Sequence, residues 1–363
     1  MIIGINATAA IKQPRTGVEE YTYQLIKHLT MLPEAGEHRF LLYLPAEALA
    51  KAGLPVFDFP LPPNFEIKIL RWPLPFLWTQ ARLAWEMLFR PPEALFIPVH
   101  ILPFGAPKKS IVAIHGLEYE YFPEYYSWLR KLYLRWSTKR AAGRARNIIA
   151  ISENTKNDLV KLYGCAKEKI KVVHHGIGFK TKSKADTVIG PYVLYLGRLE
   201  TKKNVQGILA AYKIFKEEYG MPHELILAGS PGYGYESLKP QIKSLPGAKE
   251  LGYVDEDEKW QLLAGAAIFL YPSFYEGFGL PLLEAQAAGA PVITSFGSCL
   301  PEIAGEGALF INPQNPAQIA EAVKQIIDDK PLRDKLRQSG FENVKRFSWE
   351  ECARETLKSI ISG

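Results

Sequence analysis

Short apolar runs rich in Val, Ile, Leu and aromatic residues alternate along this chain with stretches of helical periodicity. Within each run the apolar residues are continuous, which is typical of strands buried on both faces of a parallel sheet. Strands that alternate with helices form α/β domains in which helices cover both faces of a sheet. The runs that predict strands are 1–5, 39–44, 65–70, 94–99, 110–114, 147–151, 170–173, 192–196, 224–228, 249–253, 267–271, 291–294 and 309–311.

Chain length and one polar stretch predict two domains. A chain of 363 residues is long enough for about two domains. Residues 179–190 are polar, charged and poor in large apolar side chains, which is typical of a linker. We therefore expect two doubly wound α/β domains, one of residues 1–180 and one of residues 181–346. Beyond them, Ser348 and Glu351 form a capping box, which predicts that a last helix begins here.

The cysteines and the first residues indicate a cytoplasmic protein. Cys165, Cys299 and Cys352 lie far apart and form no Cys-x-x-Cys pair. An odd number of widely separated cysteines argues against a disulfide framework or a zinc site and indicates a reducing compartment. The first residues form a short apolar strand rather than a signal peptide. No run approaches the roughly 18 apolar residues that a membrane-spanning helix needs.

The charge is unevenly shared between the two halves. Residues 1–180 carry 24 Lys and Arg against 15 Asp and Glu, whereas residues 181–363 carry 20 against 23. A basic first half predicts an anionic partner there: nucleic acid, an acidic membrane surface or a phosphate-bearing acceptor. No nucleic-acid recognition motif accompanies the charge, so we expect no nucleic-acid partner.

Two glutamates, Glu276 and Glu284, stand eight positions apart around a proline that favours the start of a helix, Pro281. The N-terminus of a helix over residues 281–288 would offer unpaired N–H groups and a partial positive charge, hence an anion site suited to phosphate. Glu276 would lie at its lip, and Glu284, one turn into the helix, could accept hydrogen bonds from sugar hydroxyls. Between Glu276 and the proline lie the residues expected to contact the ligand, Gly277, Phe278, Gly279 and Leu280.

This segment resembles the Glu-x7-Glu signature of the retaining nucleotide-sugar glycosyltransferases of family 4, which have the two-domain GT-B fold. The spacing, the Gly-Phe-Gly-Leu-Pro filling and the following Ala-x-Ala-x-Gly-x-Pro-Val all match. The resemblance implies that Glu276 binds the donor sugar near the reacting carbon and that Glu284 holds the ribose. The alternative is a capped surface helix in which Glu284 only interacts favourably with the helix dipole.

Two further segments of the second half resemble the same family. The strand over residues 192–196 is followed by Gly-Arg-Leu-Glu-Thr-Lys-Lys-Asn. In this segment Arg198 can donate two hydrogen bonds to two phosphate oxygens, and Lys203 can supply a point charge. This resembles the family's Gly-Arg-Leu-x-x-x-Lys-Asn, whose arginine and lysine hold the donor diphosphate, whereas Lys202 matches no motif position. Val254 falls in a segment similar to the one whose backbone meets the nucleobase.

The acidic run after Val254 contains Asp-x-Asp, a pattern found in metal-dependent transferases of another fold. Asp255 with Glu258 three positions later is also a capping box, which predicts a helix over residues 259–263. Arg198, Lys203 and a helix dipole already neutralise a diphosphate. We therefore expect no metal ion and no cofactor besides the nucleotide-sugar donor.

In the first half, Gly17 and His115 are the candidate donor contacts. Gly17 follows the first strand and resembles the family's Gly-Gly-Val-x-x-Tyr loop, although Thr16 replaces the first glycine. His115 ends the strand over residues 110–114, where the family has a histidine that reaches the donor sugar; a purely structural role is the alternative. No Gly-x-Gly-x-x-Gly follows the first strand, which argues against a dinucleotide oxidoreductase.

The segment 128–147 predicts a basic amphipathic helix. Its apolar residues recur at helical spacing, forming one stripe of Leu129, Leu132, Tyr133 and Trp136. Two interpretations are open: the helix packs this stripe on its own sheet, or it lies on an anionic membrane. The helix carries seven basic residues and no acidic one: Arg130, Lys131, Arg135, Lys139, Arg140, Arg144 and Arg146.

Together these resemblances imply a GT-B protein of two Rossmann-like domains, with residues 347–363 crossing back onto the first. They imply retaining transfer of a hexose from a GDP- or UDP-linked donor to a glycan or lipid-linked acceptor in cell-surface polysaccharide synthesis. Residues 300–305, Leu-Pro-Glu-Ile-Ala-Gly, resemble mannosyltransferases, which favours GDP-mannose. An epimerase of the same fold and a catalytically silent nucleotide-sugar binding protein are the alternatives.

Overall fold

The computed structural model describes residues 1–15, 17–46, 56–74, 77–178 and 191–362. The chain divides into two compact units, Met1–Gly176 with Ser348–Gly363, and Ile177–Phe347. The divisions fall within four residues of the domain limits expected at 180 and 346. The expected linker, 179–190, lies outside the described residues, as does Thr16.

The described part of the first unit contains a seven-stranded parallel sheet in the order β3-β2-β1-β4-β5-β6-β7. Every residue of β4 and β5 is buried, and all of them except Ser110 are apolar. This is the burial that continuous apolar runs predict. The strands are β1 (Ile2–Asn6), β2 (Arg39–Pro45), β3 (Phe65–Leu70), β4 (Ala94–Ile97), β5 (Ser110–Ile114), β6 (Asn147–Ala150) and β7 (Ile170–Val172).

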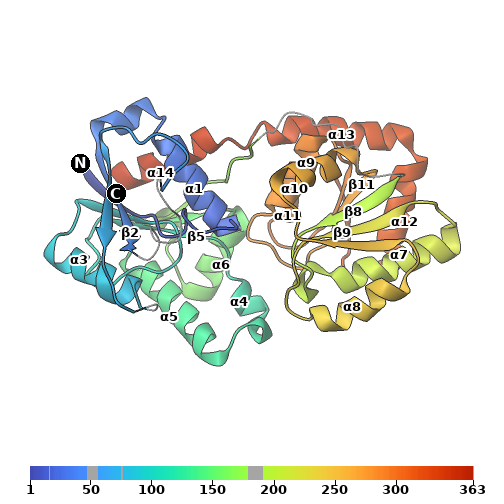
Figure 1. The fold of residues 1–363 in the computed structure, drawn as a ribbon, viewed down its shortest axis with the longest axis horizontal. Helices are drawn as coiled ribbons and strands as arrows, with labels where there is room; N and C mark the ends of the chain where they lie inside the picture. The colour runs from blue at the N-terminus through green and yellow to red at the C-terminus, as the bar shows by residue number, and fades with distance from the viewer. Residues whose placement is uncertain (16, 47–55, 75–76, 179–190, 363) are drawn as a thin grey trace. The chain divides into compact units, whose positions relative to one another are not determined.

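Two separate cores cover the faces of this sheet. On one face, α1 (Gly17–Leu29) and α14 (Trp349–Ile361) lie side by side, blue and red in Figure 1, and bury Trp349, Leu357 and Ile360. Ser348 caps α14 through the N–H of Glu351. The other face carries the π-helical turn η2 (Thr79–Leu83), α3 (Ala84–Phe89), α4 (Glu118–Tyr121), α5 (Trp128–Arg144) and α6 (Glu153–Tyr163).

Within its described residues, the second unit has a six-stranded parallel sheet in the order β10-β9-β8-β11-β12-β13. Figure 1 shows α7 and α8 on one face and α9 and α10 on the other. Its strands are β8 (Tyr192–Leu196), β9 (Glu224–Ala228), β10 (Ala248–Gly252), β11 (Ile268–Tyr271), β12 (Val292–Ser295) and β13 (Ala308–Ile311). Its helices are α7 (Val205–Tyr219), α8 (Tyr235–Ser244), α9 (Glu256–Gly265), α10 (Leu280–Ala288), α11 (Leu300–Ala304), α12 (Pro316–Asp328) and α13 (Lys330–Val344).

All thirteen strands predicted from the apolar runs are present, with ends that differ by at most two residues. The prediction of two doubly wound parallel-sheet domains is confirmed. Among the described helices, none combines the length and the apolar character needed to cross a bilayer.

Of the two interpretations of α5, the one in which it packs its apolar stripe on the sheet is wrong. The buried residues of α5 are the small ones, Ser137, Thr138 and Ala141, which let the helix approach the sheet closely. Leu132 is 58% exposed and Trp136 is 40% exposed, and the rest of the stripe is also exposed. The helical period was therefore read correctly, but small residues rather than large apolar ones make the packing face.

Candidate active site

The loop 276–279 leads into α10, as the sequence predicts, and the helix begins at Leu280, one residue before its predicted start. Gly279 is the N-cap, with a φ of +95° that favours glycine, and Pro281 is the second helical residue rather than the first. A glycine cap contributes no side-chain hydrogen bond to the helix. The loop is anchored by Phe278, whose buried ring meets the edge of Phe347 at a centroid distance of 5.8 Å. The arrangement leaves the partial positive charge of α10 without a side-chain cap.

Lys203 and Glu276, 73 positions apart in the chain, form an ion pair. The Lys203 Nζ lies 2.5 Å from Glu276 Oε1 and 3.3 Å from the Tyr271 hydroxyl. Both side chains are almost buried, at 14% and 10% exposed. The short helical turn η5 (Thr201–Lys203) follows β8, and Glu276 follows the adjacent strand β11, so the pair sits at the carboxyl edge of the sheet. That edge is where open α/β sheets bind ligands.

The ion pair keeps Lys203 charged in spite of its burial. Burial by itself would lower the pKa of Lys203, but the adjacent Glu276 carboxylate outweighs it and raises the pKa above its ordinary value. Burial, followed by the charge of Glu276, raises the pKa of Tyr271 as well, so the tyrosine stays protonated and able to donate. An anion that binds here would compete with Glu276 for the ammonium.

Ser298 and Cys299 hold the backbone of Glu276. The Ser298 hydroxyl accepts from the Glu276 N–H at 3.1 Å and donates to the Glu276 carbonyl. The Cys299 thiol donates to the same carbonyl at 3.2 Å. Ser298 has a φ of +60°, a left-handed conformation that is uncommon outside glycine. This unfavourable backbone conformation occurs at a residue that fixes the position of Glu276.

The structure separates the two neighbouring lysines and leaves Arg198 exposed. Lys202 pairs with Glu200 at 3.4 Å, whereas Lys203 pairs with Glu276. Arg198 follows Gly197, and among the described residues no carboxylate lies within 4.0 Å of its guanidinium. A Cβ on Gly229 would lie 2.0 Å from the Gly197 carbonyl oxygen, so the ends of β8 and β9 meet more closely than any side chain would allow.

Glu284 contacts a partner that the sequence motif does not include. Its Oε1 lies 2.7 Å from the Nζ of Lys259 on α9, and Lys259 also contacts Glu256 at 2.7 Å. Burial would lower the pKa of Lys259, but Glu284 and then Glu256 raise it. Asp255 caps α9 by accepting from the Glu258 N–H, as its position predicts. Val254, half-buried, comes directly before this cap.

Gly17 and His115 belong to the first unit, whereas the residues described above belong to the second. Gly17 opens α1, and a Cβ there would meet nothing within 4 Å. His115 follows β5, donates from Nε2 to the Pro98 carbonyl at 2.6 Å, and packs edge-on against Tyr21 at 4.7 Å. His175 stacks on the same tyrosine. The histidine therefore stands in a cluster of buried rings.

This cluster predicts that the first unit loses stability in mild acid. Burial lowers the pKa of His115 to about 4, below the ordinary 6.5. Between these values the unfolded chain binds a proton that the folded one does not, so stability falls as pH drops below 6.5. We expect His115 alone to cost about 2 kcal/mol between pH 7.5 and pH 5. Urea unfolding at the two pH values measures the loss. His115→Asn should reduce the dependence without abolishing it, because burial also lowers the pKa of His100 and His175. Equal midpoints in the unmodified chain would contradict the assignment.

Three residues of the site were not predicted from the sequence: Tyr271, Ser298 and Lys259. Tyr271 is the last residue of β11, a position at the ligand-binding edge that could have identified it. Ser298 and Lys259 reach Glu276 and Glu284 only through the fold, and no spacing in the sequence indicates these contacts.

Comparison with known proteins agrees with the geometry. Residues 180–343 match the family model described as glycosyl transferases group 1, and residues 15–179 match glycosyltransferase family 4. The chain is 28% identical to O-antigen chain mannosyltransferase B of Escherichia coli over 98% of both chains. It is 25% identical to O-antigen chain mannosyltransferase RfbU of Salmonella typhimurium, over 92% of this chain and 93% of that one.

The fold also matches a solved structure. Sucrose-phosphate synthase of Thermosynechococcus elongatus superposes with a TM-score of 0.73 and 19% identity, over 99% of this chain and 98% of that one. The conclusion that follows rests on the two parallel-sheet units, on the family motifs in their expected order and on these matches. The chain belongs to glycosyltransferase family 4 and has the GT-B fold.

Proposed function

We propose that this glycosyltransferase moves a hexose from a nucleotide sugar to a glycan or lipid-linked acceptor in cell-surface polysaccharide synthesis. The observation that carries the proposal is the Lys203–Glu276 pair at the carboxyl edge of the second sheet. GDP-mannose is the favoured donor, because the two similar proteins named above are O-antigen mannosyltransferases.

In the proposed reaction, positive groups stabilise the departing nucleoside diphosphate. Arg198, Lys203 and the N-terminus of α10 would share its charge, and Glu276 would bind hydroxyls of the donor sugar as positive charge develops at the reacting carbon. Glu284 would hold the ribose. We propose retention without a covalent sugar–protein intermediate, with the leaving phosphate accepting the proton of the attacking hydroxyl.

Four further residues complete the proposed donor site. Val254 would contact the nucleobase through its backbone, and Gly277 would let the donor approach the loop before α10 closely. From the first unit, Gly17 and His115 would reach the donor. The Nε2 of His115 already donates to the Pro98 carbonyl, so His115 would have to contact the donor through the rest of its ring or through its backbone.

Incubation with labelled GDP-mannose and with UDP-sugars tests the proposal. Release of nucleotide that depends on an added glycan acceptor supports transfer, and the anomeric configuration of the product, read by NMR, tests retention. Interconversion of the free nucleotide sugars would instead identify an epimerase. Tight binding with neither reaction would identify a silent binding protein.

The acceptor we favour is attached to a lipid carrier, which would place the protein at the cytoplasmic face of a membrane as a peripheral protein. The basic charge of residues 1–180 supports this proposal, because an acidic surface attracts it. A lipid-linked glycan accepted much better than the same free glycan would support it, and equal use of both would contradict it.

Transfer is expected to continue in excess EDTA. Arg198, Lys203 and the α10 N-terminus supply the positive charge that a metal ion provides to leaving diphosphates in other transferases. The carboxylate of Asp255 already accepts a hydrogen bond as the cap of α9. Initial rates with and without EDTA measure the effect. Full loss of activity that Mg²⁺ or Mn²⁺ restores would contradict the assignment.

Lys259 is expected to position Glu284 for the ribose. Lys259→Met keeps the length of the side chain but removes the ammonium that contacts Glu284, so we expect the donor KM to rise about tenfold with little change in kcat. The unmodified chain should prefer a ribonucleoside diphosphate to its 2′,3′-dideoxy analogue, and Lys259→Met should lose that preference. Lys259→Arg should retain it, and Glu256→Gln, which removes only the exposed partner, serves as control.

A further inference from the structure

The exposed apolar side chains of α3 form one end of an unusual surface. Trp85, Leu88 and Phe89 are 61%, 61% and 63% exposed. The rings of Trp85 and Phe89 lie 4.5 Å apart, so they form one aromatic pair rather than isolated side chains. Contiguous exposed apolar side chains of this kind mark a contact surface.

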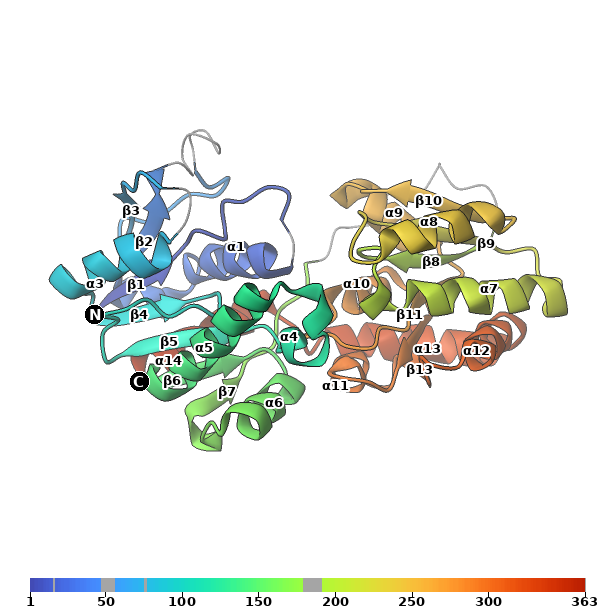
Figure 2. The same ribbon diagram turned by 90° about the horizontal axis from the view of Figure 1, so that it is seen from below.

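A loop joins this end to α5. A Cβ on Gly105 would lie 2.6 Å from Leu88, so the loop packs directly against α3. Its neighbour Phe104 packs on Trp136 of α5 with a centroid distance of 5.6 Å. Gln80 fixes the loop by accepting from the Phe104 N–H and donating to the Leu102 carbonyl. Figure 2 shows α3 and α5 on the same face of the sheet. We use the name α3–α5 face for the surface made by the exposed apolar side chains of these helices and the loop, Trp85, Leu88, Phe89, Phe104, Leu132 and Trp136.

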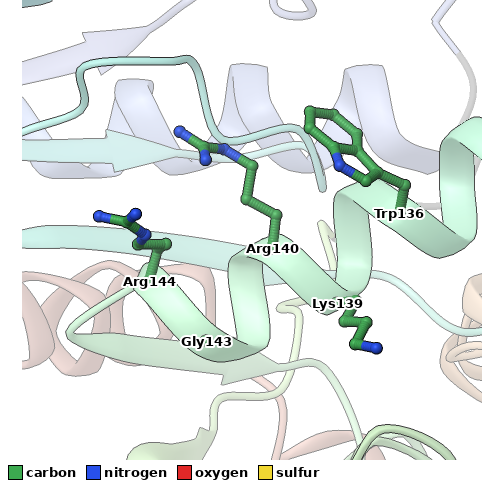
Figure 3. A pocket seen from close by; sticks show the side chains of 5 residues that line it. All are labelled: Trp136, Lys139, Arg140, Gly143 and Arg144. Atoms are coloured by element: carbon green, nitrogen blue, oxygen red, sulfur yellow. The ribbon is translucent and has the colours of Figure 1, made fainter.

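A cationic hollow lies beside the aromatic part of this face. The hollow has a volume of about 380 Å³ and is lined by Trp136, Lys139, Arg140, Gly143 and Arg144. Trp136, Arg140 and Arg144 are four residues apart and extend from the same side of α5 (Figure 3). The hollow thus contains two guanidinium groups one helical turn apart, and that of Arg140 lies 5.9 Å from the ring centroid of Trp136.

The cations of the hollow lack carboxylate partners. Among the described residues, no carboxylate lies within 4.0 Å of Lys139, Arg140 or Arg144, and the buried Nε of Arg140 has no hydrogen-bond partner. Burial lowers the pKa of Arg140, and the neighbouring Arg144 lowers it further. Arg135, in contrast, is held by Glu120 and is not part of the hollow. An anion in the hollow would relieve the repulsion between the two arginines.

We propose that the α3–α5 face docks on an anionic lipid bilayer, with a lipid phosphate in the hollow between Arg140 and Arg144. Trp85, Phe89 and Leu132 would enter the boundary between headgroups and acyl chains, where amphipathic and aromatic side chains are stable. This inference extends the proposed action on a lipid-linked acceptor, but it stands on residues outside the donor site.

Charge favours a bilayer over a second copy of the chain. A two-fold dimer places the same patch on both sides of its interface. Each copy would then bring the unpaired cations of the hollow towards those of its partner. A bilayer that contains anionic lipid offers the complementary charge together with an apolar layer.

Co-sedimentation of the full chain with vesicles tests the proposal. Vesicles of phosphatidylcholine with phosphatidylglycerol should bind the protein, vesicles of phosphatidylcholine alone should not, and added NaCl should weaken binding. Arg140→Gln with Arg144→Gln should reduce binding about tenfold or more. Lys161→Gln with Lys167→Gln removes the same charge from exposed sites of the same unit and should change binding less than about twofold.

A second pair of variants tests the apolar part. Trp85→Ser with Phe89→Ser should weaken vesicle binding about tenfold, whereas Met31→Ser, at an equally exposed apolar residue of the same unit, should not. Arg144→Gln alone keeps the test informative if Arg140→Gln perturbs the packing on Phe104. All these variants should bind GDP or UDP as the unmodified chain does, because the groups proposed to hold the nucleoside diphosphate lie in the second unit.

Three results would overturn the proposal. Equal loss in the Arg140/Arg144 and Lys161/Lys167 pairs would mean that diffuse charge, not this hollow, attracts the protein. Equal binding to both lipid types would show that the hollow does not recognise anionic lipid, because phosphatidylcholine also carries a phosphate but has no net charge. Conversion of a dimer to a monomer by the Trp85/Phe89 variant, with vesicle binding unchanged, would assign the face to a second copy of the chain.

Discussion

Glu276→Gln is expected to lower kcat by on the order of 10²–10³ while leaving nucleotide binding intact. The carboxylate is proposed to face the donor sugar, where charge develops only in the transition state, so its loss should affect turnover more than binding. The substitution also releases Lys203 from its ion pair, so GDP or UDP should bind at least as tightly as before. Steady-state rates and calorimetric titration with GDP and UDP measure the two effects.

The neighbouring residues supply matched controls. Lys203→Ala should weaken nucleoside diphosphate binding by about 1–3 kcal/mol, the value of a lost charged hydrogen bond. Lys202→Ala, one position earlier and paired with Glu200, should change it little. Glu284→Gln should mainly raise the donor KM. If Glu276→Gln raised the KM and Glu284→Gln abolished turnover, the two roles would be exchanged.

Deletion of α14 should unfold the first unit and spare the second. The helix buries Trp349, Leu357 and Ile360 almost completely in the first core. Three such side chains contribute about 7 kcal/mol, comparable to the whole stability of a typical domain. Trp349→Ala should cost about 3–5 kcal/mol, because a large ring is removed from a packed site. Calorimetry should show the transition of the first unit lowered or absent.

Two observations separate this effect from a general loss of folding. Lys358→Ala changes an exposed residue of the same helix and should leave both transitions in place. GDP or UDP should still stabilise the transition of the second unit after Trp349→Ala. A single transition lowered as a whole, with nucleotide binding lost, would show that the second unit depends on α14.

The strands could be predicted from the sequence because burial on both faces leaves an unbroken apolar signature. β5, β11 and β12 are buried at every residue, and each was predicted to within one residue at either end. Helix starts were predictable where a side chain caps the backbone, as Asp255 and Ser348 do. Both kinds of signal are local, so the chain order alone carries them.

The pairing of side chains was harder to predict. That Lys203 rather than Lys202 reaches Glu276 depends on η5, which turns the two lysines towards different carboxylates. The contact of Lys259 with Glu284 depends on how α9 packs beside α10. On α5 the periodicity was correct, but the interpretation that packed the apolar stripe on the sheet was wrong, because close approach to the sheet favoured Ser137 and Ala141 over larger apolar residues.

The return of α14 to the first sheet has a consequence for synthesis of the protein on the ribosome. Residues 177–347 are contiguous, so the second unit can fold as soon as it has emerged. The first unit emerges earlier but lacks Trp349 until about 170 more residues have been added. At roughly 5–20 residues per second this delay is about 10–30 s. The unit that is translated first is therefore completed last, and during that interval the face of its sheet that α14 covers is open to chaperones.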